Sequence, residues 1–124
     1  VSFAYDAGAD VLRDVSFSIR KGERIAIIGK NGAGKSTAAK LICGVARPRK
    51  GEVFIAGKNS RAMSVKEIGE RVGYVMQNPN QMLIKDIVKK EVEFALSIRG
   101  IAEDVIRERA TAALNACSLY PMRN

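Results

Sequence analysis

The apolar residues of the chain follow two spacings, one typical of strands and the other typical of helices. Val15, Phe17 and Ile19 alternate with polar residues, which predicts a strand with one face exposed to water. Residues 24–28 (RIAII) are nearly all apolar and rich in β-branched side chains, as expected of a buried strand in a parallel sheet. Further short apolar runs predict strands at residues 1–5, 53–56 and 72–76.

Four helices are predicted, at residues 36–45, 64–70, 86–99 and 103–119, and the first, third and fourth show the helical spacing of apolar residues. A capping box at Ser64 and Glu67 starts the second. In the third, Ile87, Phe94 and Ile98 make the apolar stripe wider than one contact surface needs, so its second side either meets a partner or is buried within the domain. Together these elements predict an α/β fold in which antiparallel strands precede a parallel core.

The segment between the predicted buried strand and the first helix has the sequence GKNGAGKST and fits the pattern G-x-x-x-x-G-K-(S/T). Its glycines permit a tight turn in which backbone N–H groups point at phosphate oxygens. Lys35 supplies a mobile cation, and the Ser36 hydroxyl can ligate Mg²⁺ at the start of the helix. The segment is therefore interpreted as the phosphate-binding loop of a triphosphate site. Its candidate binding residues are Gly29, Lys30, Asn31, Gly32, Ala33, Gly34, Lys35, Ser36 and Thr37.

Two residues outside the loop are weaker candidates for the same site. Tyr5 lies shortly upstream, where an aromatic ring can stack on a purine base, although a tyrosine that packs on its neighbours in an edge strand is the more ordinary interpretation. Gln77 follows a predicted strand, and it offers a carbonyl oxygen to Mg²⁺ and an amide that can orient a water molecule. Glutamines of ordinary loops are more common, so spacing alone leaves both roles open.

Charge adds a constraint on the partners of the chain. The net charge is +8, and residues 1–62 hold 12 Lys and Arg against 5 Asp and Glu, whereas the remainder hold 9 against 8. Positive charge around the loop can steer a nucleotide, meet acidic lipid headgroups or bind nucleic acid. The absence of Trp and an aromatic content of only 6% weaken the nucleic-acid interpretation.

Other compositional features concern the class of protein. Cys43 and Cys117 are far apart and the chain has no His, so we expect reduced, buried thiols in a cytoplasmic protein rather than a metal cluster. No apolar run reaches the roughly 20 residues that cross a bilayer, and residues 1–5 do not resemble a signal peptide. Because the chain begins with Val1, we expect a piece of a longer protein.

Tyr5, residues 29–37 and Gln77 together resemble the motifs of the nucleotide-binding domain of ABC transporters, in the order of that family. The resemblance covers the whole chain. It implies that Tyr5 stacks on adenine, that residues 29–37 are the Walker A loop and that Gln77 is the Q-loop glutamine. It also implies the cofactors ATP and Mg²⁺, with Ser36 and Gln77 as metal ligands and Lys35 and Gln77 in catalysis. The implied fold is a P-loop NTPase core with a small N-terminal antiparallel sheet, followed by the start of a helical subdomain.

Within that family, residues 75–81 (VMQNPNQ) look most like the ATPases of energy-coupling factor importers. Residues 99–124 further resemble the second module of tandem ATPases in that group, which are proposed to import thiamine or its precursor. The resemblance implies ATP hydrolysis coupled to import of a vitamin, a vitamin precursor or a metal ion. It also implies a peripheral position at the cytoplasmic face of the membrane, with transmembrane subunits and a second nucleotide-binding module as partners.

Several motifs of the family do not occur in this sequence. It has no signature of the Leu-Ser-Gly-Gly-Gln type, no apolar run ending in Asp-Glu for Walker B and no switch histidine. We therefore expect residues 1–124 to be an incomplete, N-terminal part of an ATPase domain that is inactive by itself. The alternatives are another P-loop class such as a small-molecule kinase, an ABC-type ATPase that acts on nucleic acid, and a regulatory module that only binds nucleotide.

Overall fold

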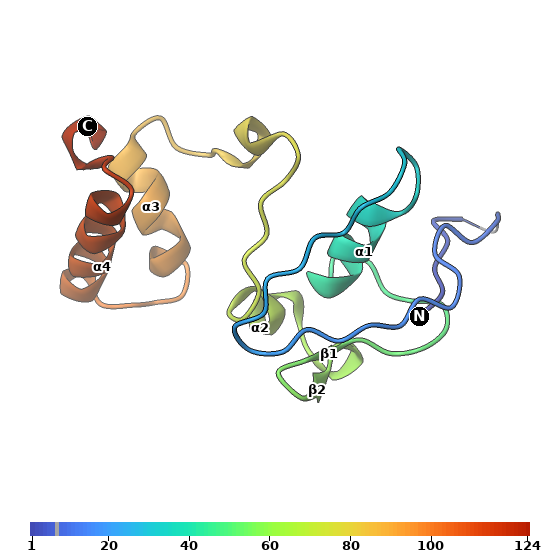
Figure 1. Cartoon of the computed structure of the whole chain (residues 1–124). Helices are drawn as coiled ribbons and strands as arrows, with labels where there is room; N and C mark the ends of the chain where they lie inside the picture. Colours follow the sequence, from blue (N-terminus) through green and yellow to red (C-terminus); the bar gives the residue numbers. More distant parts are fainter. Residues whose placement is uncertain (7) are drawn as a thin grey trace. The chain divides into compact units, whose positions relative to one another are not determined.

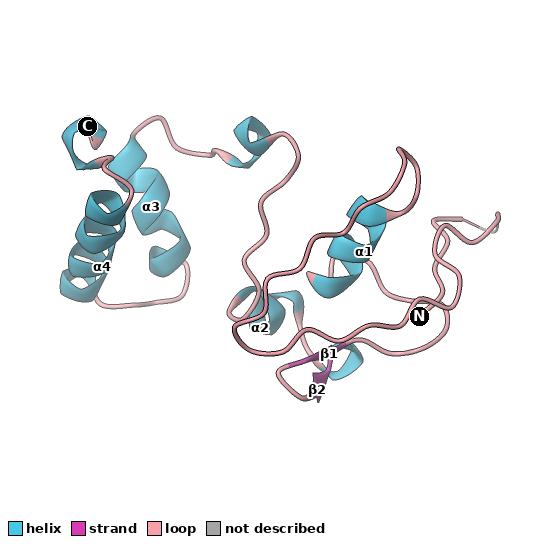
Figure 2. Ribbon diagram, in the orientation of Figure 1, coloured by secondary structure: helices cyan, strands magenta, loops and turns pink. Residues whose placement is uncertain are grey.

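The computed structural model describes residues 1–6 and 8–124, which divide into two compact units, Val1–Tyr74 and Val75–Asn124 (Figure 1). Helices and loops make up most of each unit (Figure 2). The first unit contains α1 (Lys35–Ile42), β1 (Phe54–Ile55), β2 (Lys58–Asn59), the 3-10 helix η1 (Ser60–Ala62) and α2 (Val65–Gly69). The second contains η2 (Pro79–Met82), α3 (Val88–Ser97), α4 (Glu103–Ala116) and η3 (Tyr120–Met122).

The strands are where the structure differs most from the sequence predictions. Among the described residues, the only sheet is the antiparallel pair β1–β2, in which Phe54 pairs with Asn59 and Ile55 with Lys58. The strand predicted at residues 53–56 is thus confirmed at its centre. The strand predicted at residues 1–5 is reduced to two isolated bridges, which join Ser2 to Lys50 and Phe3 to Leu12.

The strands predicted at residues 15–20, 24–28 and 72–76 are wrong, because all three segments are loops (Figure 2). The expected buried parallel strand is also not buried, since Ile28 is 93% exposed. A strand forms only with a hydrogen-bonded neighbour, and β-branched residues favour a strand mainly because they pack on a sheet surface. The described residues provide no neighbouring strand for these segments, so their composition alone does not make a sheet.

Two small hydrophobic clusters hold the first unit together. In one, Phe3 and Leu12 from the N-terminal segment pack with Ala38 and Leu41 from α1. In the other, Ile55 of β1 packs with Met63 and with Ile68 of α2. The first cluster matters for function, because it fixes α1, and with it the loop that leads into α1, against the N-terminal segment.

All four predicted helices are present, with shorter C-terminal ends. α1 ends at Ile42 because Cys43 is its C-cap and Gly44 adopts a left-handed φ of 72°. A Cβ on Gly44 would lie 2.4 Å from Cδ1 of the buried Ile68, so both the backbone and the packing require glycine here. The capping box of α2 is confirmed, since Ser64 Oγ accepts the Glu67 N–H and the Glu67 carboxylate accepts the Ser64 N–H.

We expect acid to weaken this cap. Hydrogen bonds from Ser64, first through its N–H and then through its hydroxyl, together with the Lys58 ammonium 3.3 Å away, lower the pKa of Glu67 from 4.5 to about 2. Because the pKa is lower in the folded state, Glu67 stabilises the fold above about pH 4.5, and this stabilisation is lost as the pH falls towards 2. An NMR titration of the Glu67 carboxyl carbon should give a midpoint near 2 that rises in Ser64→Ala. A wild-type midpoint near 4.5 would contradict the capping interaction.

The second unit is a helical hairpin followed by a short turn. α4 buries Ile106, Ala110 and Leu114, and Gly100, with φ of 70°, lies between α3 and α4. The Glu91 carboxylate of α3 accepts the N–H groups of Ile84 and Lys85, and in this way ties the preceding loop to the helix.

α3 begins at Val88, two residues after the predicted start at residue 86, and none of its residues is buried. Ile98, its C-cap, is 65% exposed, so part of the wide apolar stripe faces solvent.

None of the helices within the described part of the chain combines the length and hydrophobicity that a membrane span requires.

The two cysteines are free thiols. Cys43 is half-buried, and burial raises the pKa of its thiol. Cys117 is exposed, so the expectation that both thiols are buried is wrong. Its position at the C-cap of α4 explains this exposure, because the buried face of that helix is formed by other residues.

Candidate nucleotide-binding site

The loop that precedes α1 has the backbone geometry of an anion site. The N–H of Ala33 donates to the Lys30 carbonyl at 3.1 Å, which closes a turn, and the N–H of Ala38 donates to the Gly34 carbonyl at 2.8 Å as α1 begins. Gly34 is the N-cap and no side chain caps the helix. The N–H groups of the first turn are therefore available to an anion, and the helix dipole favours one.

Gly34 is required at the end of this loop for two reasons. Its φ of 88° lies in the left-handed region that side chains disfavour. In addition, a Cβ at this position would lie 2.6 Å from Leu12 Cδ2 and 3.2 Å from the Val11 carbonyl oxygen. The loop can therefore approach the N-terminal segment only because this residue has no side chain.

Lys35 folds back over the loop. Its ammonium group donates hydrogen bonds to the carbonyl oxygens of Gly29, at 2.7 Å, and Lys30, at 2.9 Å. These contacts hold a positive charge at the turn to which the sequence assigned a phosphate. A phosphate oxygen can replace the neutral carbonyl acceptors, because hydrogen bonds between two charged groups are the stronger ones.

Tyr5 lies beside the phosphate loop, because its side chain contacts that of Thr37, which is 32 positions away in the sequence. Its hydroxyl is 3.1 Å from Thr37 Oγ1, and its ring meets Phe3 at a centroid distance of 5.0 Å and an interplanar angle of 86°. The Lys40 ammonium is 5.4 Å from the ring centroid. The hydrogen bond with Thr37 lowers the pKa of the Tyr5 phenol; burial opposes this effect, and the nearby Lys40 cation adds to the lowering.

The two candidate metal ligands belong to different units. Ser36 is exposed in the first turn of α1, so its hydroxyl is accessible to a cation next to the loop. Gln77 is exposed in the second unit, two residues before Pro79 opens η2. Within the described ranges, no group of three or more His, Cys, Asp or Glu could hold a metal ion. Each of the two side chains carries an oxygen, the kind of ligand that Mg²⁺ prefers.

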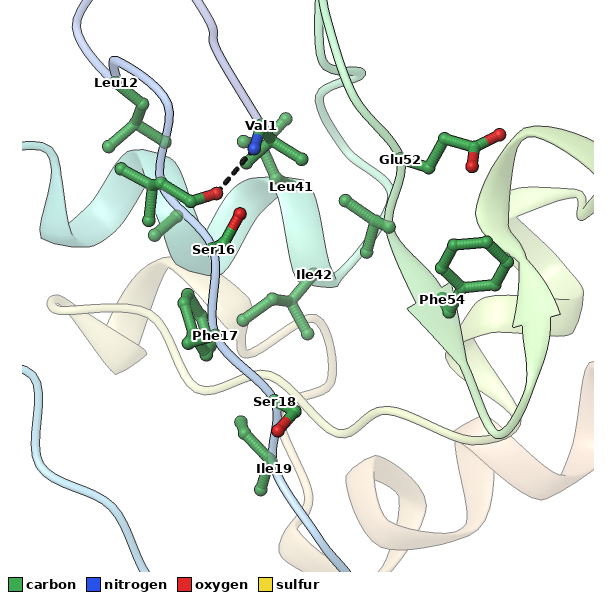
Figure 3. A pocket seen from close by; sticks show the side chains of 13 residues that line it. Val1, Leu12, Ser16, Phe17, Ser18, Ile19, Leu41, Ile42, Glu52 and Phe54 are labelled. Atoms are coloured by element: carbon green, nitrogen blue, oxygen red, sulfur yellow. Dashed lines mark hydrogen bonds between the residues drawn. The ribbon is translucent and has the colours of Figure 1, made fainter.

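Sequence reasoning missed two features around α1. Thr37 and Lys40 both reach Tyr5, and no sequence signal marks either contact. A cavity of about 390 Å³ also lies against α1, lined by Leu41 and Ile42 of the helix and by Phe17, Ile19 and Phe54 of loop and strand (Figure 3). The described residues that line it include none from residues 29–37, so this cavity is separate from the phosphate loop.

Comparison with known proteins gives the family. A family model described as ABC transporter matches residues 12–124. The chain belongs to the ABC transporter family. The match includes the phosphate loop and Gln77, while Tyr5 precedes it. This confirms the family-level resemblance and implies the P-loop NTPase fold of the ABC transporter family, of which the described residues show an incomplete set of strands.

Relatives support the same family. A protein of Clostridium perfringens (strain 13 / Type A) is 46% identical over 124 residues, and one of Enterococcus faecalis (strain ATCC 700802 / V583) is 47% identical over 125. A third, of Streptococcus mutans serotype c, is 43% identical over 123 residues. All three are provisionally named ABC transporter ATP-binding proteins. The matches cover 99 to 100% of this ABC transporter chain but 22% of each relative, so the chain spans about a fifth of their length.

Proposed function

We propose that this chain is part of the ATP-binding component of an ABC transporter, and that it binds ATP with Mg²⁺. The observation that carries the proposal is the position of the Lys35 ammonium, which is held against two backbone carbonyls of a loop that opens a helix. A polyphosphate at this loop would meet a mobile cation, backbone N–H donors and the positive end of the helix dipole. Few sites other than nucleotide sites combine these three features.

The roles of the side chains follow from their chemistry. Lys35 neutralises charge on the β and γ phosphates, the loop of residues 29–37 holds the phosphates, and Tyr5 stacks on the adenine. Ser36 and Gln77 would ligate Mg²⁺, which when bound stabilises charge on the phosphate oxygens. Catalysis by this protein consists mainly of positioning and charge stabilisation, and Gln77 orients the attacking water.

ATP hydrolysis then drives transport through partner proteins. We infer a second nucleotide-binding module that completes the ATP site, and transmembrane subunits that hold the protein at the cytoplasmic face of the membrane. The partly exposed apolar stripe of α3, which includes Val88 and ends at Ile98, supports a contact with such a subunit. The sequence VMQNPNQ at residues 75–81 supports an importer of the energy-coupling factor type, with a vitamin, a vitamin precursor or a metal ion as its substrate.

The role of Gln77 gives a test of this function. In the intact protein with its partners, we expect Gln77→Ala to leave the ATP dissociation constant within about twofold and to lower transport-coupled turnover at least tenfold, about 1.4 kcal/mol in the barrier. The reason is that Gln77 contacts the metal and the water rather than the base or the loop. Calorimetry and a phosphate-release assay measure the two quantities.

Gln81→Ala provides the matched control, because it removes the same amide from an exposed position in η2. We expect normal binding and normal turnover in that variant. If Gln77→Ala instead lost binding and turnover to the same extent, Gln77 would be a structural residue and its assignment to the site would be wrong.

A further inference from the structure

We propose that the hydroxyl groups of Tyr5 and Thr37 act as a positioning pair, which orients the Tyr5 ring for the base and thereby links base binding to the phosphate loop. This inference rests on the proposed function, since it describes how the same site recognises its nucleotide. It concerns a contact between two side chains of this chain, and it assigns to the Tyr5 hydroxyl a role that stacking alone does not require.

Thr37 is a rigid support for this contact. It is only 5% exposed, it lies in the first turn of α1, and its β-branched side chain has few rotamers in a helix. A buried hydroxyl needs a hydrogen-bond partner, and the Tyr5 hydroxyl, 3.1 Å away, provides it. The bond therefore joins a fixed atom of the loop-helix junction to the end of an aromatic ring.

Tyr5 is the exposed member of the pair, with 55% of its surface accessible to solvent. Its other contacts, with Phe3 and Lys40, do less to fix the orientation of the ring. Phe3 is buried in the α1 cluster and meets the Tyr5 ring edge-on, while Lys40 lies at 5.4 Å from its centroid. Without the bond to Thr37, the ring could rotate and swing about its side-chain torsions, and that freedom would be lost when a base stacks on it.

The direction of the ring follows from the same contact. The hydroxyl end of the ring points at Thr37, which follows Lys35 and Ser36 at the C-terminal end of the phosphate loop. Fixing the ring before the nucleotide arrives reduces the entropy cost of stacking, so the bond increases affinity for nucleotides but not for bare phosphate chains.

The test compares ATP with inorganic tripolyphosphate in calorimetry on the intact protein. We expect Tyr5→Phe, which keeps the ring and removes the hydroxyl, to raise the ATP dissociation constant about 3- to 10-fold, as loss of one hydrogen bond would. Binding of tripolyphosphate should be unchanged.

Tyr5→Ala should weaken the binding of ATP and of GTP alike, by a larger factor than Tyr5→Phe, because stacking depends on the face of a base. Tyr74→Phe, a hydroxyl deletion on a half-buried tyrosine of the same unit, is the matched control.

A double-mutant cycle separates positioning from a direct contact with the nucleotide. If the pair acts as proposed, Tyr5→Phe has no further effect on ATP binding in a Thr37→Val background. Additive effects, unchanged or tighter ATP binding by Tyr5→Phe, or an equal loss of tripolyphosphate binding would each overturn the inference. The proposed function fails separately, if ATP does not bind or if its binding does not depend on Lys35.

Discussion

Replacing Lys35 with alanine should remove most of the nucleotide affinity of the intact protein, with an expected rise of about 100-fold in the ATP dissociation constant. The carbonyls of Gly29 and Lys30 hold the ammonium over the loop. Among the described residues, no other side chain donates a hydrogen bond to these two carbonyls. Loss of one charged hydrogen bond costs about 1.5 to 3 kcal/mol, which corresponds to a factor of roughly 10 to 150.

Isothermal calorimetry on the intact protein measures this effect, and Lys21→Ala controls for charge. Lys21 is an exposed residue outside the phosphate loop, and its removal lowers the net charge by the same amount. We expect little change in that variant beyond a small, salt-dependent effect on steering. Unchanged ATP binding in Lys35→Ala would show that this loop is not the phosphate site.

Features set by residues close together in the sequence were predicted correctly. The capping box needs only Ser64 and Glu67, three residues apart, and the structure contains both of its hydrogen bonds. α1 ends at Ile42, three residues before the predicted end at residue 45, and the left-handed φ of Gly44 gives a local reason for this end. Such features depend on short-range sterics and hydrogen bonds, which a sequence pattern records directly.

Features that need distant partners were not predicted. Residues 24–28 have the composition of a buried strand, but pairing and burial depend on other segments, and Ile28 is almost fully exposed. The sequence assigns Tyr5 and Thr37 to one candidate site but does not indicate the hydrogen bond between their side chains. This bond arises because Phe3, Leu12 and α1 share one hydrophobic cluster, which places Tyr5 beside the first turn of the helix.

For the candidate site, the sequence predicts which residues form the phosphate loop but not which bonds their side chains make. The pattern places Lys35 and Ser36 at the start of a helix, and the structure has them there. It does not indicate that Lys35 is already bonded to the loop carbonyls, or that Tyr5 is bonded to Thr37. A phosphate that binds here must therefore replace the contacts of Lys35 with the loop carbonyls, and its measured affinity is a difference between two bonded states.

A polypeptide made of residues 1–124 alone should show no ATPase activity above background. The loop and its cation are present, so weak ATP binding is compatible with the structure. Hydrolysis also requires a group that activates or orients water together with a completed active site, and the sequence contains no Walker B carboxylate, signature motif or switch histidine. A second copy of the same 124 residues could not supply these groups, because it would lack them too.

The exposed apolar side chains of this polypeptide should also cause aggregation. Ile25 and Ile27 are each 49% exposed and Ile28 is 93% exposed, in a β-branched segment that has no strand neighbour among the described residues. Such a segment readily pairs with the same segment of another molecule. Light scattering at increasing protein concentration should detect the association, and Ile28→Lys should reduce it by placing a charge in the segment.

A phosphate-release assay on the purified polypeptide, beside the same polypeptide carrying Lys35→Ala, tests the absence of hydrolysis. Equal, background rates are expected for both, because the lysine stabilises charge in the transition state but cannot by itself activate a water. Turnover that depends on Lys35 and reaches about 1 per second, an ordinary enzyme rate, would place the water-activating group within these residues. The reaction would then have to use one of the 13 acidic side chains of this chain, or Gln77 without a carboxylate, rather than the completed site proposed above.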